Sequence, residues 1–173
     1  MAVRRHAARR GGPARVSPAV YLVLLLIYAF AAPALAAGGD DGPALVVTGS
    51  DGQVLVRIDL AVEPRWYLAW NHSVTGILVR DFYEFRDGTM LLTESHTPAY
   101  DAGLGHIPGR GRAESDGDGG YWIRDLDEPV PGNTYWLRVG APSVAHTLVH
   151  DGARTNLSEL APGQRVRIAV VAP

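Results

Sequence analysis

The feature that most constrains the fold is an alternation of polar and apolar residues, interrupted by Asp-Gly pairs. From Arg165 to Val170, for example, arginines alternate with valine and isoleucine. This two-residue period is typical of a strand with one buried face. Asp-Gly supplies the positive φ angles that tight hairpin turns require. The pattern predicts an all-β fold of about nine or ten short strands, either an antiparallel β-sandwich or a partly open barrel.

The N-terminal segment predicts the compartment. It holds five arginines and no acidic residue, followed by an apolar run from Ala19 to Ala32 and then Pro33. Ala34-Leu35-Ala36 places small residues where a signal peptidase cuts, so the segment has the features of an export signal. The alternative is an uncleaved anchor, because the run extended to Ala37 has 19 residues, barely enough to span a bilayer.

These features define three parts of the chain. Residues 1–37 are predicted to be a signal peptide or N-terminal membrane anchor, 38–43 a spacer, and 44–173 a single β domain. In either case we expect an exported domain, periplasmic or anchored to the outer face of the inner membrane. Membrane contact is then expected only through the N-terminal segment.

Charge and composition exclude several classes of function. Without residues 1–37, the chain has 136 residues with 11 arginines against 18 acidic residues, a net charge of −7. A surface for nucleic acid or anionic lipid requires the opposite sign. The chain has no cysteine, which excludes disulfides and cysteine-ligated metal sites. We expect no cofactor.

The centre of the chain predicts a three-stranded meander. Its strands are expected at Trp66–Val74, Ile77–Arg86 and Thr89–Thr97, joined by two-residue turns at Thr75-Gly76 and Asp87-Gly88. Side chains two residues apart share a face of a strand. One mostly apolar face is therefore expected to carry Trp70, His72, Val74, Ile77, Val79, Asp81, Tyr83, Phe85, Met90, Leu92, Glu94 and His96.

Four ionisable residues lie on that predicted face, namely His72, Asp81, Glu94 and His96. In the expected register Asp81 is opposite Glu94 and diagonal to His72, within side-chain reach. The four groups could form the polar end of a ligand pocket, bind a divalent metal, or make a satisfied structural network. A single β-bulge would move Glu94 and His96 to the other face.

Two further features bear on this site. Residues 98–118 are rich in glycine, proline and aspartate and are expected to be a long irregular loop, which could act as a lid. Ser73 follows His72 directly, and adjacent strand residues point to opposite faces, so this pair is not expected to form a nucleophile and base. We expect no catalytic residues and rank a hydrolase last.

Several short motifs resemble those of a known family. They are Trp70-Asn71-His72-Ser73-Val74, Asp81 before an aromatic pair, Leu91-Leu92, and Tyr100-Asp101-Ala102-Gly103-Leu104. The pattern resembles a small bacterial family of exported domains of unknown function, with a His-Ser-Val motif and a Gly-Ala-Gly-Leu/Met-Pro motif. Asp81 stands where that family usually has Glu. Asp101 and Gly105 depart from the first Gly and the Pro of the second motif.

Genes of that family often lie beside those of TAXI-type TRAP transporters, which import small organic solutes. The resemblance therefore implies an accessory, non-enzymatic domain whose partner is the transporter's membrane subunit or its solute-binding protein. The alternative is a small-ligand or metal-binding periplasmic module. The hypothetical ligand-binding residues, taken from the predicted face and the motifs together, are His72, Ser73, Asp81, Glu94, His96, Asp101 and Gly103.

Overall fold

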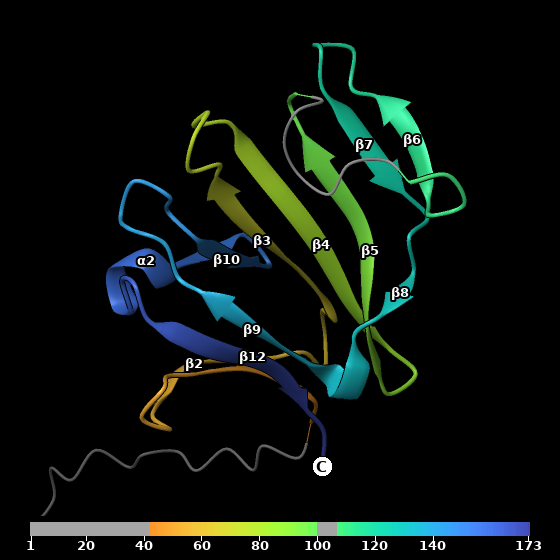
Figure 1. Ribbon diagram of the computed structural model, residues 1–173. Helices are drawn as coiled ribbons and strands as arrows, with labels where there is room; N and C mark the ends of the chain where they lie inside the picture. Colours follow the sequence, from red (N-terminus) through yellow and green to blue (C-terminus); the bar gives the residue numbers. More distant parts are fainter. Residues whose placement is uncertain (1–41, 100–106) are drawn as a thin grey trace, which may run out of the picture. The chain divides into compact units, whose positions relative to one another are not determined.

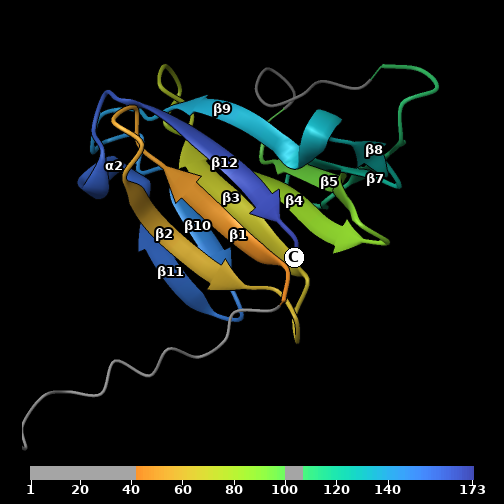
Figure 2. The same ribbon diagram turned by 90° about the horizontal axis from the view of Figure 1, so that it is seen from below.

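The structure is a computed structural model that describes residues 42–99 and 107–173, and it consists of two antiparallel β-sheets packed face to face (Figures 1 and 2). This confirms the prediction of an all-β sandwich. The described residues form twelve strands rather than nine or ten. The difference comes from short strands such as β6 (Arg112–Ser115) and β8 (Glu128–Pro129), which are too brief to show an alternating pattern.

The smaller sheet has four strands in the order β2-β1-β12-β9. Their bounds are Ala44–Thr48 for β1, Val54–Asp59 for β2, Thr134–Arg138 for β9 and Arg165–Val171 for β12. The predicted alternation in β12 is confirmed, because Val166 and Ile168 are fully buried whereas the arginines beside them are exposed. A 3-10 turn, η1 (Pro131–Asn133), leads into β9.

The larger sheet has the order β11-β10-β3-β4-β5-β7-β6, and β8 pairs with β5 beside this path. Its other strands are β3 (Arg65–Asn71), β4 (Leu78–Arg86), β5 (Thr89–Thr97), β7 (Tyr121–Arg124), β10 (Thr147–His150) and β11 (Ala153–Asn156). A single helical turn, α2 (Leu157–Leu160), follows β11. The side chain of Asn156 caps this turn by accepting a hydrogen bond from the amide of Ser158. In Figure 2 the small sheet lies across β10, β3 and β4, whereas β5, β7 and β8 extend beyond its edge.

An aromatic stack joins the two sheets inside the core. The ring of Tyr83 lies 5.6 Å from that of Trp66 and 5.4 Å from that of Tyr135, nearly parallel to both. Trp66 and Tyr83 come from the large sheet and Tyr135 from the small one. Each such pair contributes roughly 0.5–1.5 kcal/mol beyond the area that it buries. The stack therefore helps to hold the sheets in one relative position.

The two predicted turns of the meander have different outcomes. Asp87-Gly88 is a two-residue turn with φ angles of 52° and 78°, as predicted. The turn at Thr75-Gly76 was predicted wrongly, because β3 and β4 are joined by residues 72–77 and close on the pair Asn71–Leu78. Trp70 therefore lies opposite Val79 instead of Asp81. A shift of two residues keeps each strand residue on its predicted face.

A β-bulge at Thr93 changes the second half of β5. Leu92 pairs with Tyr83, but Glu94 pairs with the preceding residue of β4, Phe82, so Thr93 has no partner of its own. Its hydroxyl donates to the carbonyl of Phe82 (3.2 Å), and its carbonyl accepts from the amide of Leu126 (3.0 Å). From this point on, the side chains of β5 exchange faces.

The bulge lies where β5 changes partner. Its first half pairs with β8 at Leu91 and Leu92, and its second half pairs with β7 from Ser95 to Thr97. After the bulge, the buried positions are held by Ser95 and Thr97, which are small enough to lie against β7. The exchange keeps Glu94 and His96 out of the interior.

Some predictions fall outside the described residues. The predicted leader and most of the spacer belong to residues 1–41, for which the structure gives no description. Among the residues described, no helix is long and apolar enough to cross a membrane. The segment 98–118 is less irregular than predicted, since its described part contains β6 and a bridge between Ile107 and Arg110.

The bulge yields a first prediction. Replacing Thr93→Val removes the hydroxyl that donates to the carbonyl of Phe82 while keeping the β-branched shape. We expect the free energy of unfolding of the full-length chain to fall by about 1 kcal/mol, the typical value of one such hydrogen bond. Urea denaturation measures the change. Thr89→Val at the start of β5 is the matched control, and equal losses in both variants would contradict the role given to Thr93.

Candidate ligand groove on the outer face of the large sheet

Asp81 lies on the inner face of the large sheet, as predicted, but its partners differ from those expected. It is opposite Ser95, whose hydroxyl donates to a carboxylate oxygen of Asp81 at 2.7 Å. Burial raises the pKa of Asp81 to about 6, although the bond from Ser95 and the positive charge of Arg110 both favour the ionised form. Among the described residues, Asp81 is therefore a largely buried carboxyl group whose hydroxyl donor is Ser95.

Two phenols accompany this carboxyl group. Burial, reinforced by the charge of Asp81, raises the pKa of Tyr83, and burial likewise raises that of Tyr135. Both phenols therefore stay protonated at neutral pH. A small cavity of about 240 Å³ lies beside them, and its lining residues are Tyr83, Leu92, Glu128, Pro129, Val130, Pro131 and Tyr135.

Glu94 and His96 do not join Asp81. The bulge sends both to the outer face, so the predicted pairing of Asp81 with Glu94 is wrong. His96 accepts from Arg80 (3.1 Å) and lies 3.1 Å from a carboxylate oxygen of Asp116. Its ring also lies 4.5 Å from that of Trp122. His96 is thus held by an arginine, an aspartate and an aromatic ring.

His72 and Ser73 lie in the loop between β3 and β4, not on a strand. The Nδ1 atom of His72 lies 3.1 Å from the hydroxyl of Thr75 and 3.4 Å from its amide nitrogen, so the imidazole closes its own loop. Ser73 is exposed. The predicted diagonal contact of His72 with Asp81 is absent, because the register is shifted by two residues. Asp101 and Gly103 lie outside the described residues.

The predicted set is therefore divided between two faces and a loop. Within 42–99 and 107–173, no group of three or more His, Cys, Asp or Glu side chains could hold a metal ion.

The described surface instead carries a groove of about 460 Å³, which we call the outer groove. Strand pairing places Tyr67, Phe82, Glu84 and Glu94 on the same outer face of β3, β4 and β5. Loops at the ends of the strands complete the rim. The lining residues are Glu63, Arg65, Trp66, Tyr67, Phe82, Tyr83, Glu84, Arg86, Thr93, Glu94, Asp125, Asp127, Val149, Asp151 and Gly152.

Aromatic rings form a row across this face. Tyr67 and Phe82 have ring centroids 5.1 Å apart, and the ring of Phe82 lies 5.5 Å from that of Trp122. The three rings come from β3, β4 and β7, so the row crosses the sheet at right angles to the strands. Tyr67 and Phe82 belong to the groove and are half-buried, which leaves part of each ring accessible.

Carboxylates outnumber cations around these rings. Six acidic residues and two arginines, Arg65 and Arg86, line the outer groove. Arg65 pairs with Glu63 at 3.0 Å, and Arg86 pairs with both Glu84 and Asp127. The pKa of Glu63 is lowered, chiefly by its hydrogen bond from Arg65, so this carboxylate is ionised at neutral pH. The groove therefore has a negative rim.

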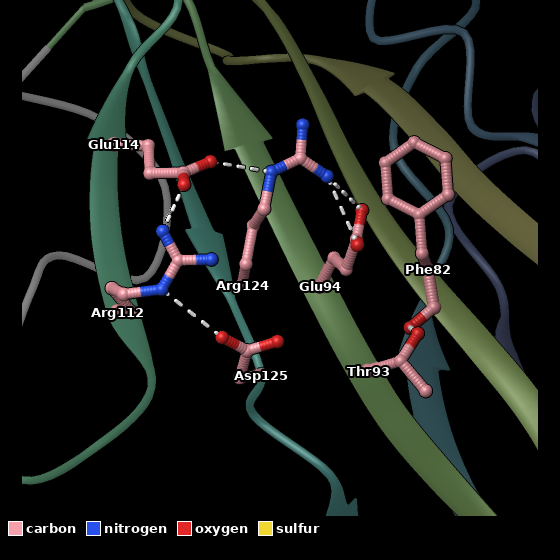
Figure 3. Close-up of polar contacts among 7 residues, drawn as sticks. All are labelled: Phe82, Thr93, Glu94, Arg112, Glu114, Arg124 and Asp125. Carbon is pink, nitrogen blue, oxygen red and sulfur yellow. Dashed lines mark hydrogen bonds and ion pairs between the residues drawn. The ribbon is translucent and has the colours of Figure 1, made fainter.

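A chain of ion pairs continues from Glu94 toward the edge of the sheet (Figure 3). One terminal nitrogen of Arg124 donates to both oxygens of Glu94, at 3.0 and 2.9 Å, and its Nε donates to Glu114 at 2.7 Å. Arg112 in turn binds Glu114 and Asp125. Figure 3 shows the carboxylate of Glu94 between Arg124 and Phe82, at the end of this chain.

The aromatic and arginine members of this face were not predicted from the sequence. The alternation of β4 carried a usable signal, since Phe82 and Glu84 lie between the inward-facing residues and must share the opposite face. Arg124 carried no comparable signal. Its approach to Glu94 depends on the pairing of β5 with β7 across the bulge.

The buried carboxyl group yields a pH-dependent prediction. The pKa of Asp81 is about 6 in the folded protein against 3.8 ordinarily, so folding is penalised once Asp81 must be ionised. The penalty is absent below about pH 4 and complete above the folded pKa. Asp81→Asn keeps an acceptor for Ser95 and should stabilise the full-length chain by on the order of 2 kcal/mol at pH 7.5, with almost no effect at pH 4.

Urea denaturation of wild type and variant at the two pH values measures this difference. Asp87→Asn, in the exposed β4–β5 turn, is the control and should have no effect at either pH. A loss of stability of Asp81→Asn at pH 7.5 would contradict the assignment of a penalised carboxylate.

Comparison with known proteins places the chain in a family. Residues 67–157, more than half of the chain and including most of β3, all of β4 and β5 and most of the outer groove, match the family described as DUF1850, a domain of unknown function. No curated protein and no solved structure matched the chain. The expected membership in a family of domains of unknown function is thereby confirmed, while the His-Ser-Val motif and the gene neighbourhood stay predictions. The chain belongs to the DUF1850 family.

Proposed function

We propose that this chain is an exported, non-catalytic accessory domain that binds a small solute in the outer groove and works beside a TRAP-type uptake system. The observation that carries the proposal is the groove itself, with half-buried aromatic rings as its floor and ionised side chains on its rim. Small-molecule sites commonly have volumes of roughly 300–1,000 Å³ and combine apolar walls with a few polar groups. The outer groove, at about 460 Å³, falls within this range.

The chemistry of the groove favours binding over catalysis. Among the described residues that line the groove, Thr93 is the one serine or threonine. Its hydroxyl group donates to the carbonyl of Phe82. The described lining contains no histidine that could serve as a base for it. Glu63, Glu84 and Glu94 each accept from an arginine, which suits the recognition of charge more than proton transfer.

The proposed location rests on the sequence. An arginine-rich start, an apolar run and Ala34-Leu35-Ala36 make the pattern of an export signal. The excess of acidic residues after this segment suits a domain that is attached to no anionic surface.

The proposed partner rests on the resemblance of the motifs around His72 and Asp81 to a family encoded beside TAXI-type TRAP transporters. Such transporters use an extracytoplasmic binding protein, so an exported binding domain would meet both the solute and the transport proteins. We therefore propose that the domain contacts the transporter's membrane subunit or its solute-binding protein.

A pull-down from native membranes tests this function. The full-length chain with a tag after Pro173 is produced in its own host. The tagged chain is captured on resin from solubilised membrane and periplasmic fractions, and the proteins that co-purify with it are identified by mass spectrometry. We expect the chain in the exported fractions, with the TRAP membrane subunit or its solute-binding protein enriched at least about tenfold over a tagged, unrelated exported protein. Retention in the cytoplasm, or no enrichment of either partner, would overturn the proposal.

A further inference from the structure

One part of the outer face already shows how this sheet holds a cation. The guanidinium carbon of Arg124 lies 4.3 Å from the ring centroid of Trp122, with Glu94 on one side and Glu114 on the other. A planar cation over an aromatic face, flanked by two carboxylates, combines cation–π attraction with charge-assisted hydrogen bonds. The arrangement is made entirely within the chain.

The neighbouring part of the face has aromatic rings and carboxylates, but there the described arginines pair with the carboxylates from the side and none of them lies over a ring. Phe82 and Tyr67 continue the aromatic row from Trp122. Glu84 lies on β4, the strand of Phe82, and Glu94 lies on the neighbouring strand β5. Within the part of the chain that the structure describes, guanidinium groups lie over Trp122 and Trp136, and none lies over Phe82 or Tyr67.

The two arginines of the groove are engaged elsewhere. Arg65 makes two side-chain hydrogen bonds to Glu63, and Arg86 bridges Glu84 and Asp127. The six lining carboxylates face these two arginines and also Arg112 and Arg124, which pair with Asp125 and Glu94 from outside the lining, so within the described residues the groove keeps an excess negative charge of two. An anionic solute would be repelled there, whereas a cation would complete the pattern.

We propose that the outer groove binds a small organic cation with a guanidinium group, held over Phe82 and Tyr67 and between the rim carboxylates. The inference deepens the proposed function and rests on the groove being a solute site. Guanidinium is favoured over ammonium because it is planar, stacks on aromatic rings and pairs with carboxylates through two parallel hydrogen bonds. A solute of this kind fits a groove of about 460 Å³.

Agmatine, which carries a guanidinium group, is a suitable probe. N-carbamoylputrescine is its matched control, because it has an uncharged urea group of nearly the same shape in place of the guanidinium group. Titration calorimetry with the full-length chain compares the two. We expect agmatine to bind at least about tenfold more tightly than the urea compound, and its affinity to fall as sodium chloride is raised from 20 to 500 mM. Succinate, a dianion, should not bind.

Variants locate the site. Phe82→Leu keeps an apolar side chain but removes the ring, and it should weaken agmatine about 2- to 30-fold, the usual range for one cation–π contact. Asp127 and Asp151 have φ angles of 41° and 45°, a region that asparagine tolerates. The double variant Asp127→Asn/Asp151→Asn should therefore keep both backbone conformations and weaken agmatine roughly 3- to 10-fold.

Asp87→Asn is the matched control for this pair. It is also an exposed turn aspartate with a positive φ of 52°, but it lies outside the groove, and it should change the affinity by less than about twofold. Circular dichroism melting identifies any variant that fails to fold, and in that case the double asparagine variant decides the result.

Other outcomes overturn the inference in recognisable ways. Equal affinity for agmatine and the urea compound, or tighter binding of succinate, would refute the guanidinium assignment while leaving a solute groove in place. Binding of an arginine-containing peptide without binding of agmatine would point to a protein partner instead. Failure of every probe would refute the inference, and the membrane pull-down would still judge the proposed function separately.

Discussion

The change of partner along β5 is the constraint on which the rest of the structure depends. One strand must pair with β8 at its start and with β7 at its end, and the extra residue Thr93 makes the transition. Because side chains alternate with a period of two, one unpaired residue reverses the faces of everything after it. Ser95 and Thr97 thereby enter the interior, and Glu94 joins Phe82 on the exposed face.

The two faces that result carry different chemistry. Inside, the carboxyl group of Asp81 has Ser95 as its hydrogen-bond donor, and its burial raises its pKa to about 6, which costs stability at neutral pH. Outside, Arg124 and Glu94 are each about one-third exposed, where an ion pair stabilises a protein by about 1 kcal/mol or less. Ion pairs that contribute so little to stability and surround aromatic rings are better suited to the recognition of a ligand, as proposed above, than to stabilisation of the fold.

Particular residues show how far the sequence could predict this arrangement. The hairpin at Asp87-Gly88 was predictable because its conformation depends on two local residues that adopt positive φ angles. Thr75-Gly76 was also predicted as a two-residue turn. In the structure, however, His72 hydrogen-bonds within its own loop, and the strands close further back, at Asn71 and Leu78. The bulge had no local signature in the sequence, because it depends on the hydrogen bond from Leu126 and on pairing with strands far along the chain.

The sequence by itself determined the all-β class, the tight turn at Asp87-Gly88 and the inward-facing residues of β4, because these follow from propensities and from a period of two within a few residues. Only the tertiary structure decided that Asp81 meets Ser95 while Glu94 meets Arg124. Those meetings depend on the register between strands that are distant in sequence. A register is set by the packing of whole sheets, and a single unpaired residue such as Thr93 is enough to reverse it.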